Sequence, residues 1–215
     1  MVSFATIKPM IGKFAKGKTN VFIDAANIEL SAKDLGFQVD YRRLHKWLKH
    51  ECDLEFIGFF TVRFENKKHD AFLTVLKKSG YKLTTKPLKL IKNRRDGTHL
   101  RKANFDVEIA VEAMKRIDSF DTFILFSGDS DFDYLIKELK KQGKKAIVVS
   151  LKYHVAKELV ESSDFYLDLR KIKKEIQRVK NHKQSLRSSQ VAGLKKARLL
   201  QRAVDNSLST AKTYY

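Results

Sequence analysis

Short apolar runs alternate with amphipathic helical patterns along the middle of the chain, and this alternation limits the possible folds more than any other feature. The runs VFI at 21–23 and FILF at 123–126 have the character of strands buried on both faces. The pattern predicts strands at 21–24, 55–62, around 81–85, 122–127, 145–151 and 165–168, and helices at about 40–50, 67–79, 104–117, 131–142 and 154–162. This order predicts an α/β three-layer sandwich with a mainly parallel central sheet.

The positive charge of the chain is concentrated at its two ends. The formal net charge is +19. Residues 171–215 hold 12 Lys and Arg against two acidic residues, and residues 1–20 hold four Lys and no acid. We therefore predict a basic leader over 1–20, an α/β domain over 21–170 and a basic C-terminal extension, helical or disordered, over 171–215. Such a distribution favours a polyanion partner, with nucleic acid first and an anionic membrane surface second.

Several function classes are excluded or made improbable by residues that the sequence lacks. Cys52 is the single cysteine, which excludes an intrachain disulfide and a zinc site built from several thiolates. No apolar run approaches the roughly 18–20 residues that span a bilayer, and the first 20 residues lack the apolar core of a secretory signal. We predict a reducing, cytoplasmic location. The sequence leaves the oligomeric state open, a homodimer included.

Acidic residues stand where predicted strands end. Asp24 closes the first strand, Asp129 and Asp131 follow the strand at 122–127 in SGDSDF, and Asp106 lies in the first turn of a predicted helix. Open α/β sheets place their ligands at the carboxyl ends of their strands. Carboxylates gathered there repel one another unless a cation lies between them, and hard Mg²⁺ or Mn²⁺ suits oxygen ligands. These four aspartates are thus candidate metal ligands.

Other interpretations of these acids remain open from sequence alone. Asp24 or Asn27 could instead cap the next element, because both residue types favour that position. A capping role would account for one aspartate in SGDSDF, but it would not account well for both Asp129 and Asp131. Ser127 is interpreted as a hydrogen-bonding support for the carboxylates. Glu112 is a weaker candidate, since it lies about two turns, roughly 9 Å, further along the helix of Asp106.

The motifs FIDAAN, NFDVEIAVEAM and FSGDSDF, followed by Gly143 and LVESSDFYLDL, resemble the NYN domains of the LabA-like (DUF88) group. This group belongs to the PIN-like superfamily of metal-dependent nucleases, which have a Rossmann-like fold. The resemblance covers about residues 20–170. It implies an acidic pocket of Asp24, Asp106, Asp129 and Asp131, with Asn27 at the family's asparagine.

The resemblance also implies a reaction. The four aspartates would hold one or two Mg²⁺ or Mn²⁺ ions for hydrolysis of a phosphodiester, leaving a 5′-phosphate and a 3′-hydroxyl. RNA is the implied substrate, with DNA also open. The sequence departs from the family where Glu112 replaces an aspartate, where Ala103 replaces a lysine and where Tyr134 replaces a proline.

The segment 86–102 interrupts the strand and helix alternation. It carries seven basic residues and one acid and includes an Asp-Gly turn at 96–97. We predict a long loop that leads into the helix of Asp106 and contacts RNA phosphates. The candidate RNA-binding residues are Lys89, Lys92, Arg94, Arg95, Arg101 and Lys102. The alternative is a solvated insertion without such a role.

Two other functions compete with a ribonuclease. The first is a catalytically silent RNA-binding or regulatory module on the same fold. The second is a haloacid-dehalogenase-type phosphatase, because Asp24 ends a strand and GDSD resembles the distal acidic loop of that fold. The phosphatase nucleophile loop requires a second aspartate two residues later, where this chain has Ala26. The phosphatase is therefore ranked below the other two candidate functions.

Overall fold

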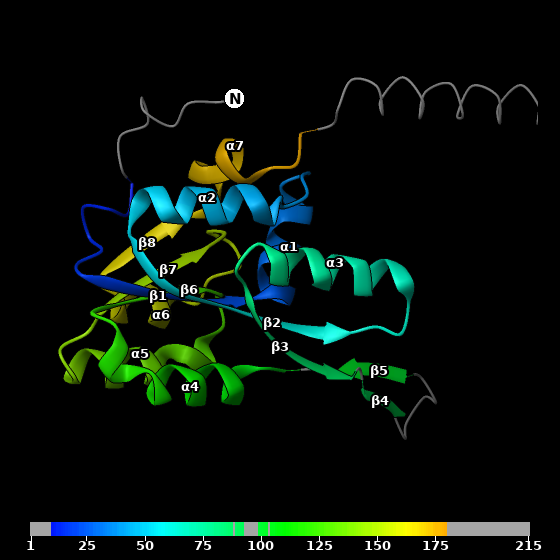
Figure 1. Cartoon of the computed structure of the whole chain (residues 1–215). Coiled ribbons are helices and arrows are strands. Elements are labelled where there is room, and N and C mark those ends of the chain that lie inside the picture. The colour runs from blue at the N-terminus through cyan, green and yellow to red at the C-terminus, as the bar shows by residue number, and fades with distance from the viewer. Residues whose placement is uncertain (1–9, 88, 93–98, 103, 180–215) are drawn as a thin grey trace, which may run out of the picture. The chain divides into compact units, whose positions relative to one another are not determined.

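The computed structural model describes residues 10–87, 89–92, 99–102 and 104–179, and it describes side chains at 10–87 and 104–179 (Figure 1). The chain divides into two compact units, residues 1–177 and 178–215. Almost all of the second unit, and residues 1–9 of the basic leader, lie outside the described residues. The domain boundaries at 20 and 170 therefore remain predictions.

A six-stranded parallel sheet forms the centre of the first unit. Its strands are β1 (Lys18–Asp24), β2 (Asp53–Arg63), β3 (Lys82–Pro87), β6 (Thr122–Phe126), β7 (Lys145–Ser150) and β8 (Phe165–Asp168). They pair in the order β3-β2-β1-β6-β7-β8, and every pairing is parallel. All five residues of β6 are buried. The predicted α/β sandwich with a parallel sheet is confirmed.

Helices cover both faces of the sheet (Figure 1). One layer contains α1 (Ala25–Asp34), α2 (Tyr41–Glu51), α3 (Lys67–Lys78) and α7 (Lys173–Ile176), and the other contains α4 (Asp106–Lys115), α5 (Asp133–Lys141) and α6 (Lys157–Ser162). Short 3-10 turns occur at η2 (Ile117–Ser119), η3 (Ser130–Phe132) and η4 (Leu169–Ile172). Each layer has its own apolar core, centred on Trp47 and Phe59 on one face and on Phe22 and Phe123 on the other.

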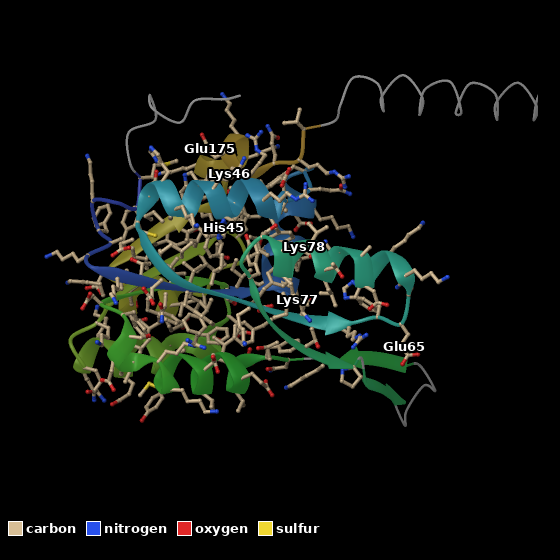
Figure 2. All side chains as sticks on the ribbon, in the orientation of Figure 1. His45, Lys46, Glu65, Lys77, Lys78 and Glu175 are labelled. Carbon is tan, nitrogen blue, oxygen red and sulfur yellow. The ribbon has the colours of Figure 1, made fainter. Side chains whose placement is uncertain are left out.

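The layer of α1, α2, α3 and α7 carries labelled charged residues in Figure 2. Lys46 lies on α2, and Lys77 and Lys78 lie on α3, in the layer opposite α4 and α5. Glu175 of α7 lies in the same layer, where its backbone carbonyl accepts from Arg43 Nε at 2.8 Å. Ile172 and Ile176 are fully buried beneath it. The apolar side chains of η4 and α7 thus complete the first layer.

Glycine follows two of the helices that the sequence pattern predicts. Gly80 follows α3 with φ of 95°, and Gly143 follows α5 with φ of 77°. Residues with a Cβ rarely adopt this left-handed conformation, so each glycine stops its helix and turns the chain into the next strand.

Three local predictions require correction. Helix α1 was not predicted, because its buried side chains are mostly small ones such as Ala25 and Ala32 and give a weak periodic signal. The predicted loop over 86–102 instead contains an antiparallel pair, β4 (Lys89–Lys92) and β5 (His99–Lys102). The Asp-Gly signal at 96–97 is typical of such hairpins, and it was interpreted only as a loop. The helical pattern at 104–117 also predicts that Met114 packs towards the sheet, whereas Met114 is 38% exposed in the structure.

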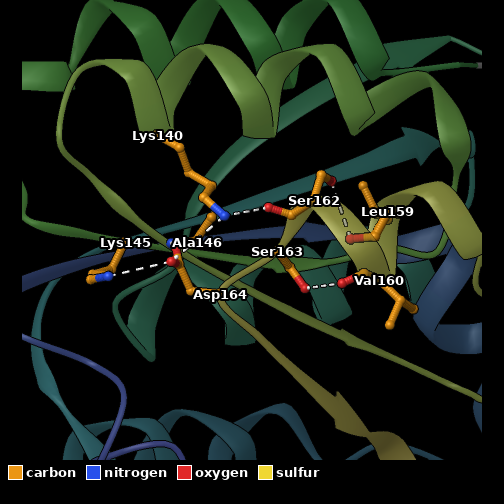
Figure 3. A network of polar contacts seen from close by, with 8 residues as sticks. All are labelled: Lys140, Lys145, Ala146, Leu159, Val160, Ser162, Ser163 and Asp164. Atoms are coloured by element: carbon orange, nitrogen blue, oxygen red, sulfur yellow. Dashed lines mark hydrogen bonds and ion pairs between the residues drawn. The ribbon is translucent and has the colours of Figure 1, made fainter.

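A polar network joins α5 to α6 and the edge of the sheet (Figure 3). Lys140 Nζ donates to the backbone carbonyl of Ser162 at 2.8 Å and lies 3.6 Å from Asp164 Oδ1. The other oxygen of Asp164 accepts from the backbone N–H of Ala146 at 2.9 Å, and Lys145 also pairs with this carboxylate. These contacts attach the C-terminal end of α5 to β7 and to the end of α6. Within the described ranges, no helix has the length and apolarity needed to cross a bilayer.

Candidate functional site

The candidate site lies where the strand order reverses. From β1 the chain proceeds outward to β2 and β3 on one side, whereas β6, β7 and β8 extend on the other. In the register of the β1–β6 pair, Ile23 lies beside Phe126. The residues that follow, Asp24 and Ser127, therefore leave the sheet at the same edge. In open α/β sheets this reversal creates the crevice in which ligands bind.

Three of the four predicted aspartates come together at this edge. One carboxylate oxygen from each of Asp106, Asp129 and Asp131 lies within 4.8 Å of the other two. Asp129 and Asp131 are adjacent through the η3 turn, where Asp129 Oδ1 accepts from the backbone N–H of Asp131 at 3.2 Å. Asp106 comes from the first turn of α4, where Asn104 Oδ1 accepts from its backbone N–H at 2.8 Å. We call these three residues the acidic cluster.

The acidic cluster places Asp106 in an unfavourable environment for a carboxylate. Its Oδ2 atom is buried and has no hydrogen-bond partner among the described residues. The pKa of Asp106 is raised above its usual value, first by burial and then by repulsion from Asp129 and Asp131. A cation between the three oxygens would relieve both the repulsion and the unsatisfied oxygen.

Asp24 lies next to the acidic cluster rather than in it. Its Oδ1 caps α1 by accepting from the backbone N–H groups of Ala26 at 3.1 Å and Asn27 at 3.3 Å. Its Oδ2 accepts from Ser127 Oγ at 3.4 Å. The capping and the site interpretations of Asp24 are therefore compatible. Burial raises the pKa of Asp24, and Asp106 raises it further by repulsion.

The buried Ser127 hydroxyl links Asp24 to the acidic cluster. It donates to Asp24 and also accepts from the backbone N–H of Asp129 at 3.3 Å. The side chain has no solvent exposure. Ser127 thus lies between Asp24 and Asp129, and its role as a support for the carboxylates stays a prediction.

Asn27 holds Gly128, the residue between Ser127 and Asp129, by a hydrogen bond. Its Oδ1 accepts from the backbone N–H of Gly128 at 3.1 Å, and Ser150 Oγ lies 3.5 Å from the same atom. The carbonyl of Gly128 accepts from the backbone N–H of Ala156 at 2.9 Å. A Cβ on Gly128 would overlap the backbone carbonyl of His154 and lie 2.7 Å from Ser150 Oγ. Only glycine lets the segment after β7 pack this closely against the acidic loop.

His154 itself is held by two contacts to α1. Its Nδ1 lies 3.0 Å from Ser31 Oγ, and its Nε2 lies 2.9 Å from Asp34 Oδ2. Ser31 is 1% exposed, so this Ser-His-Asp arrangement has no accessible nucleophile. It clamps the segment after β7 onto α1.

Other predicted site residues lie apart from the acidic cluster. Glu112 pairs with Arg116 on the same helix, with Oε1 to Nε at 2.7 Å, and Arg116 in turn stacks over Phe56. Among the predicted RNA-binding residues, Lys89 and Lys102 are partners in the backbone register of the β4–β5 pair. Lys92 and Arg101 also lie on its strands, whereas Arg94 and Arg95 lie outside the described residues.

Two charged residues near the site were missed by sequence reasoning. Lys86, at the end of β3, pairs with Glu108 in the first turn of α4 and donates to the backbone carbonyl of Asn104 at 3.0 Å. Glu29, on α1, accepts from Tyr41 Oη at 3.2 Å, and burial followed by repulsion from Asp24 raises its pKa. Neither had a local motif, because their partners are distant in sequence.

The residues of the acidic cluster fit a hard divalent cation. All the available donors are carboxylate oxygens, which Mg²⁺ and Mn²⁺ prefer. Asp106 Oδ2 is the buried oxygen that such an ion would satisfy. The same cluster offers no sulfur or imidazole ligand of the kind that zinc favours.

Comparisons with known proteins agree with this architecture. The family model described as NYN domain matches residues 18–187. The low amplitude and bright protein LabA of Synechococcus elongatus is 28% identical over 168 residues, which cover 77% of this chain and 90% of that protein. A crystal structure of a Vibrio parahaemolyticus protein of unknown function has a TM-score of 0.61 at 23% identity, covering 72% of this chain and 94% of that chain. With the family model spanning most of its length, this chain belongs to the NYN domain family.

Proposed function

We propose that this protein is a metal-dependent ribonuclease that hydrolyses phosphodiester bonds at the acidic cluster. The observation that carries the proposal is the convergence of Asp106, Asp129 and Asp131, with oxygens within 4.8 Å, from two separate elements of the sequence. Membership of the NYN domain family supports a nuclease-type fold for this site.

The chain's own residues supply positioning and charge. Asp106, Asp129 and Asp131 would hold Mg²⁺ or Mn²⁺, with Asp24 adjacent and linked through Ser127. A bound divalent ion lowers the pKa of water and neutralises charge on the phosphate oxygens. Ser127 and Asn27 hold the loop of Asp129 in place, and neither is required as a nucleophile.

RNA is the proposed substrate because of the charge of the chain and its family. The β4–β5 pair leads directly towards Asp106, and its strands carry Lys89, Lys92, Arg101 and Lys102. Contacts from such residues to phosphates would be independent of sequence and sensitive to salt. The proposal includes a cytoplasmic location, because a chain with the single cysteine Cys52 can form no intrachain disulfide of the kind that oxidising compartments favour.

The experiment combines cleavage with direct detection of the metal. Wild type, Asp129→Asn and the matched control Asp133→Asn are tested on labelled single-stranded RNA with Mg²⁺ or Mn²⁺, and Mn²⁺ binding is followed by electron paramagnetic resonance. Asp133 lies close in sequence but pairs with Lys137 at 2.6 Å. We expect Asp129→Asn to lose cleavage and weaken Mn²⁺ binding, and Asp133→Asn to keep both.

Each alternative function has a distinct outcome in the same experiment. RNA binding by the wild type without cleavage in either metal would identify a silent binding module and overturn the nuclease proposal. Turnover of a chromogenic phosphate ester, with none on RNA, would instead indicate a phosphatase.

A further inference from the structure

A groove runs between α4 and α5, next to the acidic cluster. Its volume is about 630 Å³. Ala110, Val111 and Met114 of α4 form one wall, and Phe132, Tyr134 and Leu135 of η3 and α5 form the other. Such a volume falls within the roughly 300–1,000 Å³ of sites that bind small organic groups. We call it the α4–α5 groove.

The walls of the α4–α5 groove expose large apolar side chains. Tyr134 is 74% exposed, Val111 46% and Met114 38%. The two α4 residues are three positions apart and share a side of the helix, whereas the buried residues Ile109 and Ala113 face the sheet. Helix α4 therefore has two apolar sides, one that packs on the sheet and a second that lines the groove.

The α4–α5 groove and the acidic cluster share two residues. Asp106 and Asp131 line the groove and also supply oxygens to the cluster. A phosphate held at the cluster through a cation would thus lie at one end of an apolar channel. The group attached to that phosphate would be the first to enter the groove.

The chemistry of the groove favours a nucleobase over other occupants. A base is flat and uncharged, with an aromatic face for Tyr134 and polar edges for Lys115 and Glu138, which also line the groove. A second phosphate is disfavoured there, because Glu138 and the acidic cluster are negatively charged. A base pair in a duplex has both faces covered by its neighbours, so only an unpaired base can enter.

We propose that the α4–α5 groove binds one unpaired nucleobase of the strand whose phosphate lies at the acidic cluster. This inference rests on the proposed nuclease function, since that function places the phosphate. It makes the substrate single-stranded RNA, or an unpaired loop or end of a folded RNA. The phosphate backbone positions the strand, and the groove selects for an accessible base.

The test measures base insertion separately from cleavage. A single-stranded RNA with 2-aminopurine at successive positions is bound in Ca²⁺, and its fluorescence and anisotropy are compared with those of the same strand in a duplex. The variants are Tyr134→Ala and, on the opposite wall, Val111→Glu. The matched control is Tyr153→Ala, because Tyr153 is 80% exposed and does not line the groove.

We expect the fluorescence to change at one position of the single strand and at none in the duplex. Loss of a base stack weakens binding by roughly ten- to a hundredfold, so Tyr134→Ala and Val111→Glu should lose that affinity while Mn²⁺ binding remains. Tyr153→Ala should behave as the wild type.

The outcomes separate this inference from the nuclease proposal. Base insertion that is lost in both groove variants supports the groove even where the wild type cleaves nothing. If both groove variants still cleave RNA, bind Mn²⁺ and keep the RNA affinity of the wild type, the groove inference is overturned and the nuclease proposal remains. A dimer that Val111→Glu dissociates, with no effect on RNA, would also overturn it and assign the groove to a second copy.

Discussion

Replacing Gly128 by alanine should reduce the stability of the protein and distort the acidic cluster. The new Cβ would lie 2.7 Å from Ser150 Oγ and 2.8 Å from the carbonyl carbon of His154, and closer still to the carbonyl oxygen, whereas ordinary contact begins at 3.4 Å. His154 cannot simply rotate away, because the obstructing atoms belong to its backbone and its ring is held by Ser31 and Asp34. The acidic loop must therefore move.

The cost of this movement can be estimated from the contacts that it breaks. Displacement strains the hydrogen bonds from Gly128 N–H to Asn27 and from Ala156 N–H to the Gly128 carbonyl. Two such bonds and the overpacking together correspond to about 2–4 kcal/mol. For a chain of this size this lowers the Tm by roughly 4 to 16 °C. Because Asp129 follows directly, Mn²⁺ affinity should fall by about ten- to a hundredfold.

The assay is thermal unfolding by circular dichroism together with Mn²⁺ titration. Gly143→Ala provides the control, since its φ of 77° adds backbone strain of about 1–2 kcal/mol but a Cβ there meets no atom within 4 Å. This control should lose some stability and keep its Mn²⁺ affinity. A Gly128→Ala protein with the Tm and Mn²⁺ affinity of the wild type would refute the packing argument.

Three further predictions concern the carboxylates. Ser127→Ala leaves the Asp129 N–H and Asp24 Oδ2 without their buried partner. The free energy of unfolding should therefore fall by about 1–3 kcal/mol, and Mn²⁺ binding should weaken. The control Ser130→Ala, at an exposed position, should change neither quantity. Asp106→Asn removes a carboxylate that its acidic neighbours repel, so without divalent ions at pH 7 it should raise the Tm by roughly 2–4 °C. This corresponds to about 1 kcal/mol or less of unfolding free energy, because solvent screens this group. A lower Tm would contradict the raised pKa of Asp106. Because its pKa is raised, Asp106 of the wild type takes up a proton before the falling pH reaches the usual 3.8. The Tm difference between the wild type and Asp106→Asn should therefore disappear at low pH. Mn²⁺ binding, titrated at each pH, should weaken at a higher pH than for an ordinary aspartate.

The strands of this fold were predictable because their apolar runs are continuous. β8 matches its predicted bounds. β6 differs by one residue, and its five buried side chains leave a continuous apolar signal. The β4–β5 pair gave no such signal, because it lies outside the main sheet and its strands mix lysines with apolar residues. The Asp-Gly dipeptide at 96–97 in the sequence was the signal that could have identified it.

The acidic cluster was predictable for a topological reason. Parallel strands end at one edge, so the acids that follow β1 and β6, Asp24 and Asp129, were expected to lie near each other there. Asp106 follows no strand of the main sheet, and its place in the cluster depends on where α4 begins. Lys86 was not predictable in the same way, because its contact with Glu108 depends on how the start of α4 lies against the end of β3. The α4–α5 groove was missed because helical periodicity does not say which apolar residues the neighbouring helix leaves uncovered. Met114 is the clearest example.

The arrangement of β1 and β6 side by side has a consequence for assembly. The two strands are neighbours in the sheet, yet about a hundred residues separate them along the polypeptide, and the helix of Asp106 arrives from the intervening stretch. Such long-range pairing forms late and slowly. A truncated chain that ends before β6 would lack Asp129 and Asp131 altogether. Under the proposed function, Mn²⁺ binding would therefore report that α4 and the segment after β6 have come together.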